Sequence, residues 1–333
     1  MKNKYISETD KLFISGANGM VGSAISRFLE KTDFELINKK NLLIPSRKDL
    51  DLSDPYQVNL WFKKNRPDIV IIAAAKVGGI NANKNYPYEF LIQNLKIQNN
   101  IIDASRNFEV KRLLFLGSSC IYPKYSKQPI KEEYLLEGQL EETNQCYAIA
   151  KIAGIKLIEA IRKEYKFDAI SLMPTNLYGP HDNYDLNDSH VLPALIRKFY
   201  EAKRKNFPYV ICWGSGEPLR EFLHVDDLAE ACIFCLCNWD PSDKYAPKDI
   251  KGNELSWLNI GSSEEISIKN LAQKIANEID YRGEIIWDRN KPDGTPRKLL
   301  DSSRINNLGW KAKISIEKGI KKTILDYQNE NIF

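Results

Sequence analysis

Tyr147 and Lys151 stand four residues apart in the segment YAIAK, a YxxxK pattern. On a helix this spacing places both side chains on one face. A tyrosine of pKa ~10 exchanges protons poorly at neutral pH unless a neighbouring cation stabilises its phenolate. Ser118, at the end of the apolar run RLLFLGSS, could bond a carbonyl oxygen beside them. Together the three residues indicate hydride transfer at a carbonyl, whereas each one alone also fits an ordinary helix or turn position.

A glycine-rich segment, GANGMVG, follows the first apolar run of the chain and precedes a helical pattern. Gly16, Gly19 and Gly22 permit a tight turn and let a pyrophosphate approach the backbone, where a helix N-terminus offers free N–H groups. A plain strand-to-helix turn is the alternative. The position between a strand and a helix favours a dinucleotide site.

The residues beyond this loop indicate which dinucleotide would bind. An NAD site usually has an acid about 20 residues past the loop, where it bonds the ribose 2′-hydroxyl. Here no acid follows Glu35 until Asp49. The stretch instead carries three cations: Lys39, Lys40 and Arg47. Cations suit a 2′-phosphate, so the sequence predicts NADP(H), with a solvated basic loop as the alternative. Asp51 and Leu52 are expected near the adenine.

Apolar strand-like runs alternate with amphipathic helical stretches over the first half of the chain. The strand runs are residues 11–16, 68–75, 112–119 and 168–176, and the helical patterns are 21–31, 87–108 and 147–165. Continuous apolar strands are typical of a parallel sheet covered on both faces. The alternation predicts an α/β fold, a Rossmann doubly wound parallel sheet. Looser helical and strand patterns beyond residue 177 predict a smaller mixed α/β lobe.

We therefore expect a flexible N-terminus over residues 1–10 and an NADP-binding Rossmann domain over 11–177, to which some later segments return. Residues 178–333 would be mainly a substrate-binding lobe, with the ligand cleft between the two.

Composition narrows the class of protein further. The 333 residues carry a net charge of +4, too small to indicate nucleic-acid binding. No apolar run approaches the roughly 20 residues that cross a bilayer, and the N-terminus lacks a secretory pattern. The six cysteines show neither a disulfide framework nor a metal-binding spacing. These features predict a cytoplasmic enzyme without a membrane, nucleic-acid or metal partner.

Eight segments of the chain resemble blocks of the GDP-L-fucose synthase family. They read GANGMVGSAI, AAAKVGGI, LLFLGSSCIYP, YAIAKIAGIKL, MPTNLYGPHDN, SHVLPALIRKF, WGSGEPLREFLHVDDLA and KPDGTPRKLLD. The resemblance runs from about residue 11 to the last helix. SSC, NLYGPHDN and SHV are more discriminating than the serine, tyrosine and lysine, which many relatives share. Asn18 is a departure, because some members carry a basic residue in this loop.

The resemblance implies conversion of GDP-4-keto-6-deoxy-D-mannose to GDP-L-fucose, by epimerisation at C3 and C5 and then NADPH-dependent reduction at C4. It implies Cys120 as the base and His190 as the acid of the epimerisation. A thiolate and an imidazolium have ordinary pKa values of ~8.5 and ~6.5, near enough to neutrality to serve. Alone, Cys120 would also fit a small buried hydrophobe, and His190 a capping or surface residue.

The resemblance also implies binding roles for further residues. Those expected around the cofactor are Gly16, Asn18, Gly19, Met20, Val21, Gly22, Arg47, Asp51, Leu52, Ala74, Leu116, Gly117, Lys151, Pro174, Thr175, Asn176, Leu177 and His190. Those expected around the GDP-sugar are Asn176, Lys198, Trp213, Arg220 and Asp293. Cations suit the diphosphate and an aromatic face suits the guanine or the sugar. Lys198 could equally be a solvated helix charge, and Asp293 a turn residue.

Two other functions remain open from the sequence. One is an epimerase or reductase of a related GDP-4-keto-6-deoxy sugar, such as a heptose. The other is a non-catalytic Rossmann protein that senses NADP(H). By family analogy we expect a homodimer, in which residues 87–108 and 147–165 of two chains form a four-helix bundle.

Overall fold

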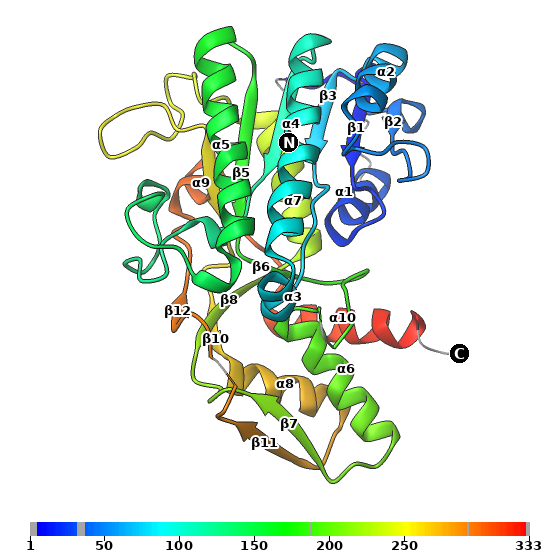
Figure 1. Cartoon of the computed structure of the whole chain (residues 1–333), viewed down its shortest axis with the longest axis vertical. Helices are drawn as coiled ribbons and strands as arrows, with labels where there is room; N and C mark the ends of the chain where they lie inside the picture. The colour runs from blue at the N-terminus through cyan, green and yellow to red at the C-terminus, as the bar shows by residue number, and fades with distance from the viewer. Residues whose placement is uncertain (1–4, 32–36, 187, 292, 331–333) are drawn as a thin grey trace.

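The computed structural model of the chain describes residues 5–31, 37–186, 188–291 and 293–330. In Figure 1, a layered unit of parallel strands and long helices lies above a smaller unit that contains β7, β11, α6 and α8.

A six-stranded parallel sheet forms the core of the larger unit, in the order β2-β1-β3-β4-β5-β9. Its strands are β1 Leu12–Ser15, β2 Leu42–Leu43, β3 Ile69–Ile72, β4 Arg112–Leu116, β5 Ala169–Pro174 and β9 Trp257–Ile260. All residues of the five longer strands are buried, as expected of strands covered on both faces. The prediction of a doubly wound α/β fold is confirmed.

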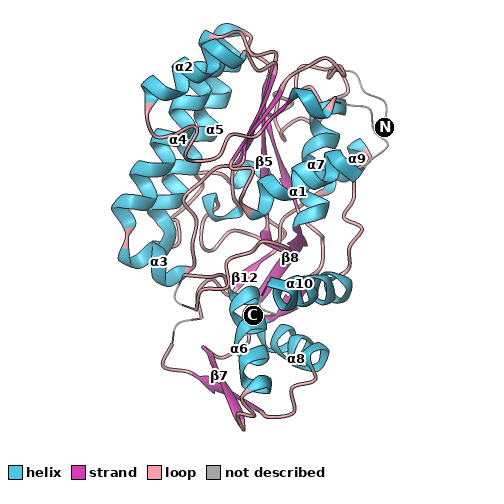
Figure 2. Cartoon of the chain, turned by 90° about the vertical axis from the view of Figure 1, so that its right-hand side faces the viewer, coloured by secondary structure: helices cyan, strands magenta, loops and turns pink. Residues whose placement is uncertain are grey.

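Helices cover both faces of this sheet (Figure 2). Helix α4 packs against α2 and α5 on one face, and α1 packs against α7 on the other. The helices of this unit are α1 Met20–Lys31, α2 Pro55–Asn65, α3 Ile80–Asn85, α4 Pro87–Asn107, α5 Gln145–Tyr165, α7 Val225–Asn238 and α9 Ser303–Leu308. Although α7 and β9 lie beyond residue 177, they join this unit.

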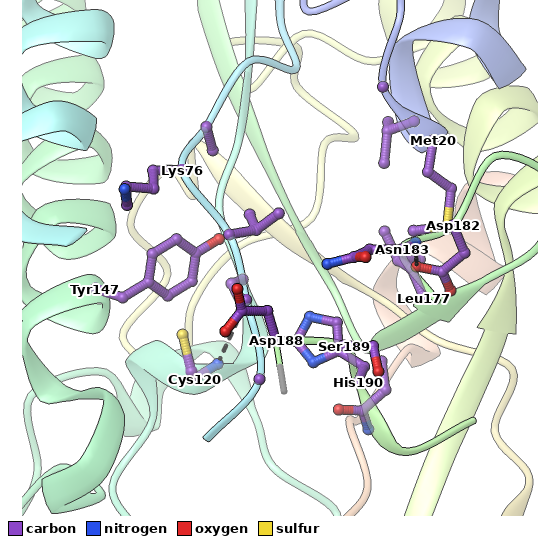
Figure 3. A pocket seen from close by; sticks show the side chains of 18 of the residues that line it. Met20, Lys76, Cys120, Tyr147, Leu177, Asp182, Asn183, Asp188, Ser189 and His190 are labelled. Atoms are coloured by element: carbon purple, nitrogen blue, oxygen red, sulfur yellow. Dashed lines mark hydrogen bonds between the residues drawn. The ribbon is translucent and has the colours of Figure 1, made fainter. Parts of the chain in front are cut away.

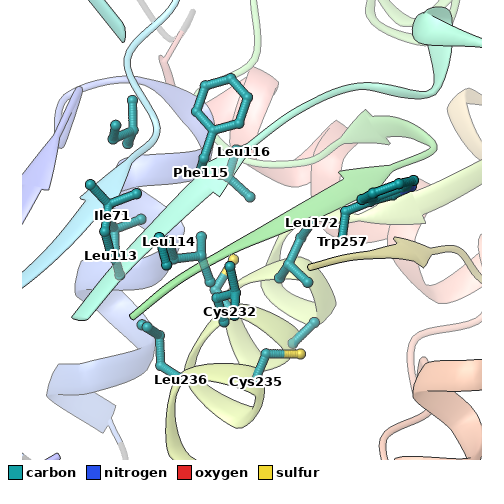
Figure 4. Close-up of a cluster of buried hydrophobic side chains, with 14 of the residues drawn as sticks. Ile71, Leu113, Leu114, Phe115, Leu116, Leu172, Cys232, Cys235, Leu236 and Trp257 are labelled. Atoms are coloured by element: carbon teal, nitrogen blue, oxygen red, sulfur yellow. The ribbon is translucent and has the colours of Figure 1, made fainter. Parts of the chain in front are cut away.

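The cysteines of α7 belong to its hydrophobic core. Cys232, Cys235 and Cys237 are buried free thiols. Figure 4 shows Cys232 and Cys235 packed with leucines of β4 and β5. They therefore hold the helix against the sheet by apolar contact, as small hydrophobic residues do.

The smaller unit has its own hydrophobic cluster, built around Leu195, Phe199 and Ile275. Strands β6 Asn176–Tyr178, β10 Glu265–Ser267 and β12 Arg297–Lys298 all pair with β8 Leu219–His224. Strands β7 Tyr209–Trp213 and β11 Glu284–Asp288 form a separate parallel pair. The helices of this unit are α6 Val191–Arg204, α8 Ile268–Ile279 and α10 Ile316–Glu330.

The N-terminal segment is expected from the sequence to be a flexible tail over residues 1–10. Residues 1–4 lie outside the described residues. From Tyr5 onward the chain is packed against the larger unit: the Tyr5 hydroxyl donates to Asp243 at 2.8 Å, and the Arg112 guanidinium lies 4.4 Å from the Tyr5 ring centroid. Ile6 and Asp10 are buried. Residues 5–10 therefore contact the larger unit, and the flexibility expected of residues 1–10 stays a prediction.

Candidate active site

A cleft of about 1040 Å³ runs along the carboxyl ends of β1, β3, β4 and β5 and reaches the smaller unit. Carboxyl ends of parallel strands are where open α/β sheets bind their ligands. Apart from Lys39 and Lys40, every residue that the sequence assigned to catalysis, cofactor or substrate lines this cleft. The structure thus brings together side chains from Gly16 to Asp293, far apart in the sequence, while their individual roles stay predictions.

The glycine loop has the geometry that a pyrophosphate needs. Gly16 has a φ of +75°, which favours glycine, and a Cβ there would lie 2.8 Å from the Ala74 Cα. A Cβ on Gly22 would lie 2.2 Å from the Gly16 carbonyl oxygen. Helix α1 then begins at Met20 with no acid in its first turn. The loop therefore presents backbone N–H groups and a positive helix end to an anion.

Gly22→Ala is expected to weaken NADPH binding by about tenfold or more, which corresponds to a loss of ~1.4 kcal/mol or more. The added methyl meets backbone rather than a flexible side chain, so the loop must shift. Fluorescence titration with NADPH measures the Kd, and a thermal melt without cofactor checks the fold. A folded variant with wild-type affinity would contradict this prediction.

At the other end of the cofactor region, Arg47 and Asp51 line the cleft. Hydrogen bonds from Ser53 hold the pKa of Asp51 below its usual range, with a smaller contribution from Arg47. Lys39 and Lys40 form an exposed turn and do not line the cleft. Of the three cations Lys39, Lys40 and Arg47, Arg47 is therefore the one that lines the cleft, and its contact with a 2′-phosphate stays a prediction.

Ser118, Tyr147 and Lys151 meet at the end of β4. Burial raises the pKa of the Tyr147 phenol, and a hydrogen bond with Ser118 partly opposes this effect. The Lys151 ammonium donates to the Leu116 carbonyl at 2.8 Å and lies 5.8 Å from the Tyr147 ring centroid. Burial lowers the pKa of Lys151 to about 8. A neutral phenol beside a hydroxyl can donate a proton to a carbonyl oxygen as charge develops on it.

Cys120 lies in a short 3₁₀ turn, Ser119–Ile121, directly after Ser118. Its backbone N–H points to the Ser118 hydroxyl at 3.4 Å, and its side chain is 8% exposed. Burial raises the pKa of the thiol, while Lys298, Ser118 and Lys151 act in the opposite direction. The thiol thus lines the cleft with a pKa above its usual value, and the two lysines and Ser118 limit that rise.

His190 enters the cleft from the opposite side. It precedes α6 at the N-cap position but makes no side-chain cap hydrogen bond. In Figure 3 the Cys120 thiol and Tyr147 ring lie on one side of the pocket and the His190 ring on the other. The surrounding protein lowers the pKa of the imidazole, and the nearby Lys298 lowers it further. A thiol and an imidazole from different segments therefore face one space.

Lys298 lines the same space and was not assigned from the sequence, although it lies in the quoted block KPDGTPRKLLD. Strand β12 pairs with β8 so that Lys298 stands opposite Arg220. Its neighbour Arg297 points outward to an ion pair with Glu265. The alternation of a strand thus directs Lys298 inward, but a two-residue strand is too short to predict from sequence.

Lys298→Met is expected to move both limbs of one pH–rate profile to higher pH. The rate is that of proton exchange at C3 and C5 of the keto sugar. The Lys298 cation lowers the pKa of Cys120 and of His190, so its removal lets both pKa values rise. Activity that needs a thiolate then begins at higher pH, and activity that needs an imidazolium persists to higher pH. Deuterium exchange followed across pH measures both limbs. Limbs at the wild-type positions would refute the electrostatic role.

The end of the cleft in the smaller unit carries the predicted nucleotide-binding residues. Trp213 is 50% exposed, with the Lys198 and Lys291 ammonium groups 5.7 and 5.3 Å from its ring centroid. Burial lowers the pKa of Arg220. The Asp293 carboxylate already accepts from the Ser215 backbone at 2.7 Å and its hydroxyl at 2.9 Å. Asp293 therefore holds the turn at Ser215, and its expected role at the GDP-sugar stays a prediction.

His224 and Asp227 have structural roles at the start of α7. His224 caps α7 by accepting from the Asp226 N–H at 3.2 Å. Asp227 accepts backbone N–H groups of Lys313 and Ile314. Among the described residues, no group of three or more potential ligands is arranged to hold a metal ion. Nor does any described helix combine the length and apolarity needed to cross a bilayer.

A family model agrees with this geometry. The NAD dependent epimerase/dehydratase family model matches residues 12–247. The solved structure of "MlghC, GDP-mannoheptose C4 reductase from Campylobacter jejuni with NADP bound" superposes with a TM-score of 0.86 at 35% identity, and covers 97% of this chain and 99% of its own.

Curated relatives narrow the family further. The putative GDP-L-fucose synthase 2 of Arabidopsis thaliana is 49% identical over 98% of this chain and 94% of its own length. The GDP-L-fucose synthase of Escherichia coli (strain K12) is 50% identical over 94% of this chain and 95% of its own. The chain therefore belongs to the NAD dependent epimerase/dehydratase family and, within it, to the GDP-L-fucose synthase family.

Proposed function

We propose that the protein converts GDP-4-keto-6-deoxy-D-mannose to GDP-L-fucose, by epimerising C3 and C5 and then reducing C4 with NADPH. One observation carries the proposal. Cys120 and His190 face a single cleft that also holds Ser118, Tyr147 and Lys151. A ketoreductase needs only the last three residues, whereas a thiol and an imidazole across the same space add acid–base chemistry. Identity of about half with GDP-L-fucose synthases supports the same assignment.

NADP(H) is the proposed cofactor, and the cleft fits it. The glycine loop leaves room for the pyrophosphate, and Arg47 and Lys151 line the cleft. Arg47 would bind the 2′-phosphate, and Lys151 would bond the nicotinamide ribose. A relative solved with NADP has the same fold. When bound, the reduced cofactor supplies the hydride that is transferred to C4.

Epimerisation follows from the acidity of protons next to the C4 ketone. In the proposed step the Cys120 thiolate removes a proton from C3 or C5, and the electron pair moves to the C4 oxygen as an enolate. Ser118 and Tyr147 stabilise that oxygen by hydrogen bonds. His190 then protonates the carbon from the opposite face, which inverts its configuration. Cys120 then loses the abstracted proton to solvent and His190 takes one up, so that the same two groups can serve the second carbon.

Reduction uses the groups at the end of β4. As C4 becomes an alkoxide, Tyr147 donates its proton to the oxygen while Ser118 keeps it in place. The raised pKa of Tyr147 keeps the phenol protonated before the reaction. Lys151 stabilises the phenolate that remains.

The decisive experiment is incubation with GDP-4-keto-6-deoxy-D-mannose and NADPH in deuterated water. We expect NADPH oxidation, deuterium at C3 and C5, and a product with GDP-L-fucose stereochemistry. NADPH oxidation without deuterium would leave only a ketoreductase. No reaction at all would reject the proposed substrate and favour a non-catalytic NADP(H) sensor, a reading that the intact Ser118, Tyr147 and Lys151 speak against.

A related GDP-4-keto heptose is the second candidate substrate. Its support is the fold similarity to the GDP-mannoheptose C4 reductase. Identity to that protein is 35%, compared with 49–50% to the GDP-L-fucose synthases, so the hexose is favoured. Competition between the two keto sugars in one reaction, with kcat/KM for each, decides between them.

We further propose a homodimer in the cytoplasm. Helices α4 and α5 pack side by side at the surface of the larger unit and expose Tyr88 and Ile149, which are 70% and 46% accessible. Two copies of this pair could form a four-helix bundle. Free thiols throughout the described residues suit a reducing compartment. Light scattering measures the mass in solution, and fractionation of cells locates the protein.

A further inference from the structure

The proposed acid of the epimerisation, His190, lies in a different part of the fold from the other catalytic residues. Ser118, Cys120, Tyr147 and Lys151 all follow or face β4 of the larger sheet. His190 instead lies just before α6, a helix of the smaller unit. Its distance from Cys120 therefore depends on whatever holds the segment 188–190, here termed the acid loop, against the larger unit.

One main-chain hydrogen bond makes that connection. The backbone N–H of Gly79 donates to the Asp188 carbonyl at 2.7 Å. Gly79 precedes α3 and belongs to the larger unit, so the bond joins the two parts of the cleft. It ends two residues from His190.

Gly79 is required there by closeness and not by backbone angle. Its φ of −68° is open to any residue. A Cβ built on it, however, would lie 2.4 Å from the Ser189 carbonyl oxygen and 3.2 Å from the Ser189 carbonyl carbon. Both are backbone atoms, so any side chain at this position must displace the acid loop.

Buried amides hold the glycine turn rigidly from the other side. The Asn83 side chain donates to the Gly78 carbonyl at 2.8 Å and to the Gly79 carbonyl at 3.0 Å, and it is 7% exposed. Asn94, 2% exposed, bonds both the N–H and the carbonyl of Lys76. These hydrogen bonds hold the turn in place, so the position of the acid loop depends on its contact with Gly79.

We propose that Gly79 positions His190 for epimerisation, and that it is a positioning residue selective for that half of the reaction. The inference rests on the proposed function. Reduction at C4 depends on groups around β4, which the turn does not displace. A shifted acid loop should therefore impair inversion of configuration and spare hydride transfer.

Gly79→Ala tests this selectivity. We expect NADPH consumption with the keto sugar to stay near the wild-type rate, while inversion at C3 and C5 falls by about a hundredfold, the scale expected of a misplacement near 1 Å. Deuterium should still enter, because Cys120 is undisturbed, so the reduced product should carry deuterium with its starting configuration retained. Mass and stereochemistry of the product measure both. An equal loss of inversion and reduction, or no loss of either, would overturn the proposal.

Gly78→Ala is the matched control. Its methyl meets the side chains of Ala82 and Phe90 at 3.0 and 3.1 Å and only touches the Asp188 carbonyl at 3.5 Å. The ratio of inversion to reduction should then keep its wild-type value. Asn83→Ala, which loosens the turn without adding bulk, should lower the ratio in the same direction as Gly79→Ala and provides a second test if Gly79→Ala does not fold.

NMR of the histidine rings separates this inference from the proposed function. The chain has three histidines, and loss of a signal in His190→Gln assigns the His190 ring. We expect that signal to move in Gly79→Ala and to stay in Gly78→Ala, whatever the substrate. A stationary signal would overturn the positioning role, whereas a moved signal without turnover of any keto sugar would overturn only the proposed function.

Discussion

Cys120→Ser is expected to suppress C3 and C5 epimerisation by about a hundredfold or more, the usual contribution of a general base, while C4 reduction continues. Serine keeps nearly the same shape, but its hydroxyl is far less acidic than a thiol and forms no useful alkoxide near neutral pH. The cations that favour the thiolate, Lys298 and Lys151, cannot compensate for this difference. The product should be a reduced sugar with little deuterium at C3 and C5.

Deuterium content of the reduced product is the measurement, with NADPH consumption recorded in the same reaction. Cys146→Ser is the matched control, because Cys146 adjoins Tyr147 in the chain but does not line the cleft. It should behave as wild type. Deuterium entering Cys120→Ser at the wild-type rate would remove the thiol from the mechanism.

The larger unit is predictable from sequence because its signals are local. Residues 69–75 and 113–116 are continuous apolar runs, which are typical of strands buried on both faces of a sheet. The glycine spacing in residues 16–22 marks both the turn and the helix after it. Each signal lies within a few residues, so no knowledge of distant pairing is needed.

The smaller unit is less predictable because its geometry depends on long-range pairing. Lys298 enters the cleft only because β12 lies beside β8, with Lys298 opposite Arg220. A two-residue strand carries no periodicity that could indicate this. The N-terminal residues are a similar case, since the packing of Tyr5 depends on Asp243, far along the chain.

Catalytic residues divide in the same way. Ser118, Tyr147 and Lys151 can be inferred from spacing and context. For Cys120 and His190, spacing shows nothing, and only the family resemblance pointed to them. Neither residue spacing nor the family resemblance indicated the proposed role of Gly79. A glycine with an ordinary φ is distinguished only by the backbone atoms that it contacts.

Tyr147→Phe is expected to produce the opposite defect from Cys120→Ser: C4 reduction should fall by about a hundredfold to ten-thousandfold, the range for loss of a general acid. NADPH should still bind with near wild-type Kd, because the Lys151 ammonium is held by the Leu116 carbonyl and not by the phenol. Ser118 keeps one hydrogen bond to the ketone oxygen, so deuterium exchange should persist at a reduced rate.

Single-turnover NADPH oxidation, NADPH titration and deuterium exchange measure these three quantities separately. Unchanged turnover would exclude Tyr147 as the proton donor, and loss of NADPH binding would show that the substitution disturbs the cofactor site. The comparison with Cys120→Ser is the stronger test. If one cleft performs two separable reactions on one ketone, each variant should abolish the reaction that the other retains, because the thiol acts at the carbons beside the ketone and the phenol acts at its oxygen.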